Sequence, residues 1–196
     1  MLEETLGYLD ALFGDEPASF EGKRFALRGG YNHPRPVQEP RPPLLVGGKG
    51  GPRMLRLAAR FADGWNTVWR WTPEAYGERV AAAREACERE GRDPATLRLS
   101  LGLSTVVGED EADLVRRYAL MRERLPAGTV DAVPLQELRG DGLVGTPSDV
   151  LERLERFAAL GVGELVVGPA PVWFALPDPT MLDLLAERVL PAAREL

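Results

Sequence analysis

The chain has 196 residues, 44% of them hydrophobic, and a formal net charge of -6. These values suit a single domain over 1–196 with an apolar core, and the acidic balance argues against a nucleic-acid partner, which would require clustered Lys and Arg. The single cysteine, Cys87, and the single histidine, His33, exclude a disulfide framework and a His-rich metal site within the chain, so we expect no bound metal.

The expected location is the cytoplasm, with no membrane partner. No apolar run approaches the roughly 20 residues that a membrane span requires. The opening residues Met1 to Glu4 are acidic, unlike a secretory signal. A lone cysteine also suits a reducing compartment.

The N-terminal region predicts a short helix, a hairpin and a connector. Residues 4–13 have the pattern of an amphipathic helix, which Gly14 ends, and residues 20–27 resemble a hairpin centred on Gly22. Five prolines lie between Pro34 and Pro43. Because proline fixes φ and lacks an N–H donor, this stretch is expected to be extended.

The middle of the chain predicts three strands separated by helices. The predicted strands are Leu44–Val46, Trp65–Trp69 and Leu97–Val107. The first intervening helix covers 53–61, with an apolar face formed by Met54, Leu57, Ala58 and Phe61. The second begins at Thr72-Pro73-Glu74 and ends at Gly91, with a buried stripe formed by Tyr76, Val80, Ala83 and Cys87.

The last third predicts a charged helix over 109–125 and an irregular insertion over 126–142. Such an insertion is either a mobile substrate lid or a disordered segment. A helix from Thr146-Pro147 to Gly161 follows, and then a fourth strand over 164–168. A last helix is expected to begin at Asp178-Pro179 and to be limited by Pro191.

The alternation of strands and helices predicts a parallel α/β sheet with right-handed crossovers. Polar and glycine-rich stretches follow the carboxyl ends of the strands, which favours part of a TIM (β/α)8 barrel. An open doubly wound sheet is the structural alternative.

The best-marked candidate site is the loop formed by Gly47, Gly48, Lys49, Gly50 and Gly51, between the first strand and the first helix of the sheet. Glycines allow positive φ, so several backbone N–H groups can point at one anion, and the helix adds the positive end of its dipole. The loop has neither the Walker nor the Rossmann glycine spacing. It is predicted to contact a phosphate or the edge of a flavin-like ring; a tight turn without a ligand is the alternative.

Weaker candidates surround this loop in the sequence. Asn66 is expected towards the carboxyl end of the second strand and is a candidate pocket residue, whereas Trp65 is expected to pack. Arg70 lies between two tryptophans, and we expect it either to contact an anionic ligand or to lie in a surface loop. Trp173 and Phe174 are expected either to line the pocket or to cover an open edge of the sheet. Cys87 is expected in the core and His33 on the surface.

A run of motifs resembles the luciferase-like monooxygenase superfamily, most closely its branch that uses the deazaflavin coenzyme F-420. The motifs, in chain order, are Phe20-Glu21-Gly22, Leu44-Leu45-Val46-Gly47-Gly48-Lys49-Gly50-Gly51, Ala62-Asp63-Gly64-Trp65-Asn66, Gly91-Arg92-Asp93-Pro94 and Val144-Gly145-Thr146-Pro147. Because that family forms eight-stranded barrels, the resemblance implies that this chain corresponds to the second half, strands five to eight.

The resemblance implies an oxidoreductase acting on a small organic substrate, with Gly47, Gly48, Lys49, Gly50, Gly51 and Asn66 at the cofactor. Hydride transfer with coenzyme F-420 is the first expectation and FMN-dependent monooxygenation the second. No catalytic residue is assigned, because the first four strands have no counterpart here. A non-catalytic binding or structural role is the alternative from another class. Strand edges left open predict self-association or binding of a complementary N-terminal half.

Overall fold

The computed structural model describes residues 1–124, 133–169 and 178–196. Contacts within these residues form two compact units, Met1–Trp65 with Ala83–Leu97 and Asn66–Ala82 with Arg98–Leu196. Strand β4 (Gly64–Trp69) and helix α3 (Pro73–Arg89) run from one unit into the other along the chain. No helix in the described ranges is both long and apolar enough to cross a membrane.

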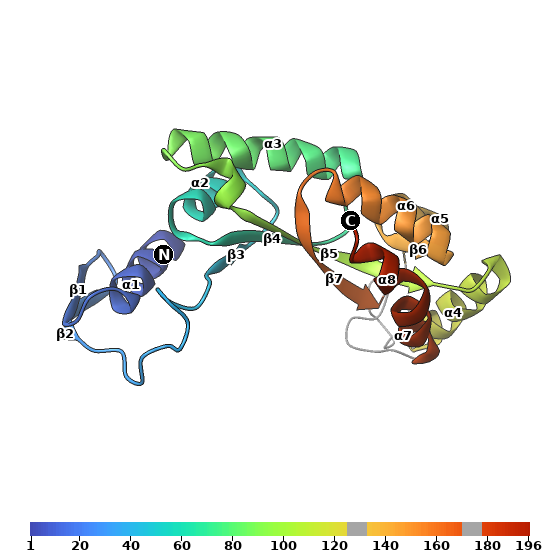
Figure 1. Cartoon of the computed structure of the whole chain (residues 1–196), viewed down its shortest axis with the longest axis horizontal. Helices are drawn as coiled ribbons and strands as arrows, with labels where there is room; N and C mark the ends of the chain where they lie inside the picture. Colours follow the sequence, from blue (N-terminus) through green and yellow to red (C-terminus); the bar gives the residue numbers. More distant parts are fainter. Residues whose placement is uncertain (125–132, 170–177) are drawn as a thin grey trace. The chain divides into compact units, whose positions relative to one another are not determined.

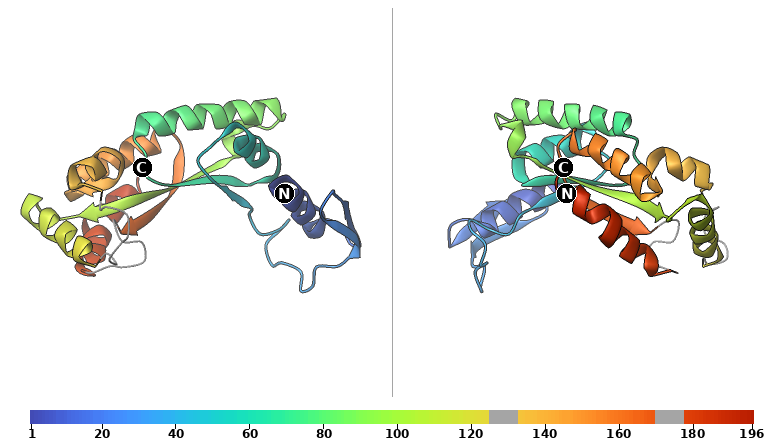
Figure 2. Two further views of the ribbon diagram at one scale, coloured as in Figure 1. Left: turned by 180° about the vertical axis from the view of Figure 1, so that it is seen from behind. Right: turned by 45° about the vertical axis from the view of Figure 1, so that its right-hand side comes forward.

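The first unit contains a hairpin and the first βα segment of the sheet (Figure 1). Its elements are α1 (Leu2–Phe13), β1 (Ala18–Glu21), β2 (Ala26–Gly30), β3 (Leu45–Gly47), α2 (Pro52–Phe61) and a 3-10 turn at Pro94–Thr96. The hairpin packs beside α1 (Figure 2), where Tyr8 makes edge-on ring contacts with Phe20 and Phe25. The predicted helix and hairpin are confirmed, and the proline-rich stretch expected to be an extended connector forms bends, with neither helix nor strand.

The second unit contains the long strand of the sheet and most of the helices. Its elements are β5 (Arg98–Val107), α4 (Glu111–Glu123), α5 (Leu135–Asp141), β6 (Leu143–Gly145), α6 (Pro147–Ala158), β7 (Val162–Pro169), α7 (Thr180–Leu184), a π-helical turn (Leu185–Val189) and α8 (Leu190–Ala193). The strand order is β3-β4-β5-β6, and β7 also pairs with β5. Both β6 and β7 are parallel to β5. The parallel sheet that the alternating sequence predicts is thus observed, with β6 as an additional strand that was not predicted.

The register of β5 and β7 separates two faces of the sheet. Ser100 pairs with Glu164 and Gly102 with Val166, so these positions share one face. On the other face of β5, Leu101 and Leu103 are completely buried. One face of β5 is therefore apolar, whereas the opposite, polar face carries Ser100 and Glu164 together with Gly102 and Val166, and Ser100 is buried there as well.

Sequence-encoded caps fix the helix ends. At the start of α3, Thr72 Oγ1 accepts a hydrogen bond from the Ala75 N–H at 3.1 Å, as predicted from Thr72-Pro73-Glu74. Arg92 donates to the carbonyls at the end of α2, with 2.5 Å to the Ala62 oxygen and 3.2 Å to the Ala59 oxygen. The Gly91-Arg92-Asp93-Pro94 motif therefore fastens α2 in place, because the last carbonyls of a helix lack partners within the helix.

Two expectations about the elements are wrong, and a third is correct only in part. Residues 135–141 form helix α5 and not an irregular segment, because the helix buries the side chain of Leu138. Residues 126–132 of the predicted insertion lie outside the described residues. The final helix does not stop at Pro191 but continues to Ala193, since the π-helical turn before it alters the hydrogen-bond pattern that proline would interrupt. On α2, Leu55 and Ala59 are buried with Leu57 and Ala58, while Met54 and Phe61 are only partly buried.

Candidate cofactor-binding site

The predicted glycine loop forms the turn between β3 and α2. It leaves the carboxyl end of β3 at Gly47 and enters the helix at Gly51. Two of its residues have positive φ, +152° at Gly48 and +73° at Gly50. Side chains rarely adopt such angles, so glycine is required for this turn. The turn thus has the backbone conformation that the sequence predicts.

The outer surface of this turn is open. Gly47, Lys49 and Gly51 are exposed, and a Cβ atom added at Gly47 or Gly51 would meet nothing within 4 Å. Gly50, by contrast, is buried. A ligand can therefore approach the backbone at the two ends of the loop without displacing a side chain.

The beginning of α2 lacks the groups that usually neutralise a helix N-terminus. Its N-cap is Gly51, no side chain caps it, and the first turn contains no acidic residue. The first N–H groups of a helix have no partner within the helix and carry the positive end of its dipole. This end of α2 therefore suits an anion such as a phosphate group.

The buried side chain of Trp65 anchors the turn. Its side chain is fully buried, and its indole Nε1 donates a hydrogen bond to the Gly48 carbonyl at 3.0 Å. This confirms the packing role expected for Trp65. It also fixes the peptide plane at Gly48, so the orientation of the loop is set by the core.

Asn66 lies in a different environment from the one predicted. It is the third of six residues in β4 and not at the carboxyl end, and its Nδ2 donates to Ser100 Oγ at 2.8 Å. Ser100 Oγ in turn donates to Glu164 Oε1 at 3.2 Å. These bonds join three strands across the polar face of the second unit. They give Asn66 a role between strands, and its predicted cofactor contact stays a prediction.

Arg70 is engaged by acidic side chains and does not present a free cation. Its Nε donates to both carboxylate oxygens of Asp141, at 2.8 and 2.9 Å, and its Nη2 lies 2.6 Å from Glu137 Oε1. Hydrogen bonds to these two carboxylates raise the pKa of Arg70. The Trp71 N–H also donates to the Asp141 carbonyl at 2.7 Å. Arg70 thus secures α5 against the end of β4. It lies in the loop after that strand, which was one of its two predicted outcomes, and carboxylates of the protein take the place of the anion contact that was the other.

The remaining candidates have simpler outcomes. Cys87 is a buried free cysteine, as expected, and burial raises the pKa of its thiol. His33 is exposed, also as expected, and its Nε2 lies 3.3 Å from Glu16 Oε2. Trp173 and Phe174 lie outside the described residues.

A second βα turn lies between β6 and α6, and the sequence analysis did not predict its strand. Its sequence nevertheless repeats that of β3: Leu143-Val144-Gly145 matches Leu45-Val46-Gly47, and each copy is followed by a helix that begins with proline. Gly145 has φ +152°, the value found at Gly48. The repeated tripeptide is the signal by which this turn could have been found.

The second turn differs at the helix N-terminus. Thr146 caps α6, and Asp149 completes a capping box. The Thr146 N–H and hydroxyl each donate to Asp149 Oδ2 at 2.8 Å. A carboxylate of the protein therefore already occupies the position that an anionic ligand would take.

Comparison with known proteins agrees with this fold. Residues 1–164 match the family model described as luciferase-like monooxygenase. The F420-dependent hydroxymycolic acid dehydrogenase of Mycobacterium tuberculosis is 29% identical over 98% of this chain and 54% of its own. An F420-dependent secondary alcohol dehydrogenase in complex with an F420-acetone adduct superimposes with a TM-score of 0.74, at 19% identity, over 99% of this chain and 61% of its own. A monooxygenase from Streptomyces bottropensis superimposes with a TM-score of 0.72, at 21% identity, over 96% of this chain and 60% of its own.

The chain spans about half the length of this curated relative and about three fifths of the two solved structures. These structures are TIM-barrel enzymes, so the parallel α/β arrangement found here corresponds to part of such a barrel, as predicted. The family model covers 1–164, which is most of the sequence. The chain belongs to the luciferase-like monooxygenase family.

Proposed function

We propose that this chain provides the cofactor-binding part of an oxidoreductase that transfers a hydride between coenzyme F-420 and a small organic substrate. The open N-terminus of α2 carries this proposal, because it offers exposed glycine backbone and an uncapped helix dipole where a coenzyme phosphate can bind. The deazaflavin ring supplies the redox chemistry when bound, and the protein positions it. The relative aligned over 98% of the chain is described as F420-dependent, which supports this coenzyme.

The FMN-dependent monooxygenase is the second candidate. The family model is itself described as a monooxygenase, and a monooxygenase is among the structures that share the fold. FMN also carries a phosphate, so the β3–α2 turn suits both coenzymes equally. The substrate and the direction of hydride transfer belong to the whole enzyme, of which this chain matches only a part.

Direct titration of the chain tests the proposal. Coenzyme F-420 and FMN are added separately, and fluorescence polarisation reports binding while absorbance identifies the bound ring. We expect saturable binding that favours coenzyme F-420 and weakens when inorganic pyrophosphate is added. Stronger binding of FMN would favour the second candidate. No binding of either coenzyme would support a non-catalytic role.

A pair of glycine variants links any binding to the turn. Gly47→Val places a side chain in the open space at the end of β3, whereas Gly163→Val does the same in β7, where an added Cβ also meets nothing within 4 Å. We expect both variants to fold, since the added Cβ atom has open space at either position; circular dichroism checks this. Only Gly47→Val should abolish binding. Equal affinities for the two variants would place the coenzyme elsewhere.

A further inference from the structure

The glycines that leave the β3–α2 turn open also leave its backbone with little restraint of its own. Four of the five residues from Gly47 to Gly51 are glycine, which has no Cβ atom and adopts many conformations. The planar peptide after Gly48 therefore has more orientations available than a peptide that follows a larger residue. In some of them the Gly48 carbonyl oxygen would face the outer surface of the turn, where its partial negative charge would repel a coenzyme phosphate.

One hydrogen bond from the core selects among these orientations. Trp65 lies on β4, the neighbour of β3 in the sheet, and its fully buried indole donates to the Gly48 carbonyl at 3.0 Å. A buried N–H group that loses its acceptor costs more free energy than an ordinary hydrogen bond contributes, so this bond resists breaking. The Gly48 carbonyl oxygen is therefore held towards the core and kept from the outer surface of the turn.

The backbone just before Trp65 is itself fixed to the start of β3. The Asp63 N–H donates to the Leu44 carbonyl at 2.8 Å, and Asp63 Oδ2 accepts the Leu44 N–H at 2.6 Å. The guanidinium of Arg41 donates to the same carboxylate oxygen. One short segment thus holds β3 at both ends, through Asp63 at its start and through Trp65 at the glycine turn. The indole cannot shift relative to β3 without straining these bonds.

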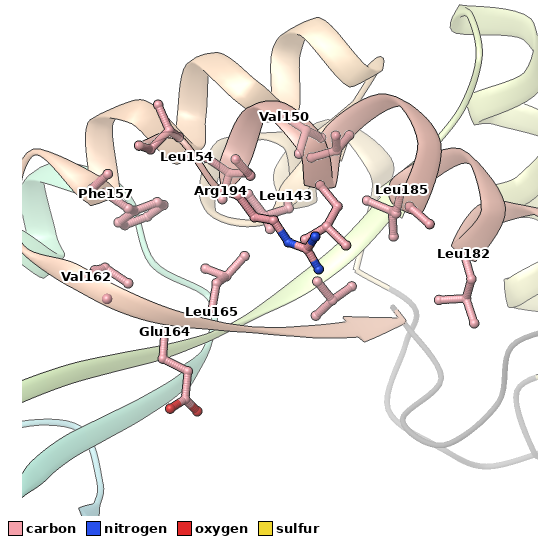
Figure 3. A pocket seen from close by; sticks show the side chains of 18 residues that line it. Leu143, Val150, Leu154, Phe157, Val162, Glu164, Leu165, Leu182, Leu185 and Arg194 are labelled. Atoms are coloured by element: carbon pink, nitrogen blue, oxygen red, sulfur yellow. The ribbon is translucent and has the colours of Figure 1, made fainter.

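An apolar groove in the second unit is a competing place for the coenzyme. It has a volume of about 680 Å³, and side chains such as Leu154, Phe157 and Leu165 line it (Figure 3). The Glu164 carboxylate points to the other side of β7 (Figure 3). Among the described side chains that line the groove, only the Arg194 guanidinium can donate a hydrogen bond to a phosphate. The β3–α2 turn, with its uncapped helix N-terminus, is the better site for that phosphate.

We propose that Trp65 is a positioning residue for the coenzyme and acts through the Gly48 carbonyl, since its own side chain is too deeply buried to touch a ligand. This role rests on the proposed function, in which the coenzyme binds at the β3–α2 turn. The indole N–H keeps the turn in the orientation that suits an anion before any coenzyme arrives. A chain that adopted this orientation only part of the time would bind more weakly in proportion to that fraction.

Trp65→Phe tests this role, because phenylalanine keeps an aromatic ring but has no N–H donor. In the polarisation titration its affinity for coenzyme F-420 and for FMN should fall about threefold to tenfold, the effect expected for one lost hydrogen bond. Trp71→Phe is the matched control. The Trp71 indole donates to Thr67 Oγ1 at 3.1 Å in the second unit, so this variant loses a similar bond and should keep the native affinity.

Three results of the titration would overturn the proposal, once circular dichroism has shown that the variants fold. The first is a native affinity in Trp65→Phe, and the second is an equal loss of affinity in Trp71→Phe. The third is a loss of affinity in Arg194→Gln, which would place the coenzyme in the apolar groove. We expect Arg194→Gln to bind as the native chain does.

Nuclear magnetic resonance of the chain without coenzyme distinguishes failure of this role from failure of the proposed function. In the native chain the amides of Gly48 and Gly50 should each give one sharp signal, whereas in Trp65→Phe they should broaden through exchange between orientations on the microsecond to millisecond timescale. Exchange in the native turn itself would overturn the role of Trp65, and this measurement decides even if Trp65→Phe does not fold. The expected spectra without any coenzyme binding would count against the proposed function alone, because Trp65 would still order the turn.

Discussion

The two βα turns of this chain share a strand sequence but differ in what they leave open. Both follow Leu-Val-Gly, both contain a glycine with φ +152°, and both lead into a helix with proline in its first turn. In each, the third helical residue packs against that glycine: Met54 at Gly48 and Asp149 at Gly145. Because methionine cannot accept a strong hydrogen bond and aspartate can, one helix N-terminus is left available to a ligand and the other is closed by its own side chain.

The largest expected effect comes from making the first turn resemble the second. Met54→Asp places a carboxylate beside the Gly51 N–H, where it occupies a donor and repels an incoming phosphate. Coenzyme affinity should fall about tenfold or more, which corresponds to about 1.4 kcal/mol. The measurement is the same polarisation titration as for the native chain.

Ser148→Asp is the control for charge. It adds one acid to the first turn of α6, so the net charge changes equally, but the β3–α2 turn keeps its open donors. Coenzyme affinity should be unchanged. A similar loss in both variants would mean that long-range repulsion, and not the local donors of α2, governs binding.

The conformation of the first turn gives the next largest effect. Gly50→Ala forces a side chain into φ +73° at a buried position, which should lower the free energy of unfolding by about 1–2 kcal/mol. Gly47→Ala lies in extended backbone with open space around it and should change that free energy by less than about 0.5 kcal/mol. Urea unfolding measures both. Equal losses would show that the loop does not require glycine for its geometry.

The contrast between the turns also shows what the sequence could and could not predict. The glycine turn and the strands and helices other than β6 and α5 followed from periodicity and from residues such as Pro73 and Gly91, whose effects are local. The positions of Asn66 and Arg70 depend on Ser100 and Asp141, which lie 34 and 71 residues away, so no local pattern indicated them. Strand β6 was not predicted for a similar reason: it is defined by its pairing with the end of β5 from Thr105 to Val107, which its own sequence does not indicate.

Removing the cap from the second turn should have a moderate effect confined to stability. In Thr146→Ala, the Asp149 N–H loses its acceptor at the start of α6, which should cost about 1 kcal/mol of unfolding free energy. Thermal or urea unfolding measures this loss. Coenzyme affinity should not change, since the β3–α2 turn is untouched; a weaker affinity would show that the two turns are not independent.

The smallest expected effect is the pH dependence of that cap. Hydrogen bonds from the backbone N–H and the hydroxyl of Thr146 lower the pKa of Asp149 below its ordinary value. A carboxyl group with a lowered folded-state pKa stabilises the protein above its unfolded pKa, near 3.9, and loses that contribution as the pH falls through the folded value. The difference in unfolding free energy between the native chain and Asp149→Ala, about 1 kcal/mol or less near neutrality, should therefore shrink below about pH 4.

Using this difference cancels the contribution of Asp113, whose pKa is lowered to about 2 because hydrogen bonds from Arg117, the Glu109 N–H and Arg116 outweigh the opposing effect of burial. A difference that stayed constant down to pH 3 would mean that the Asp149 carboxylate does not cap α6, and the second turn would then be as open to anions as the first.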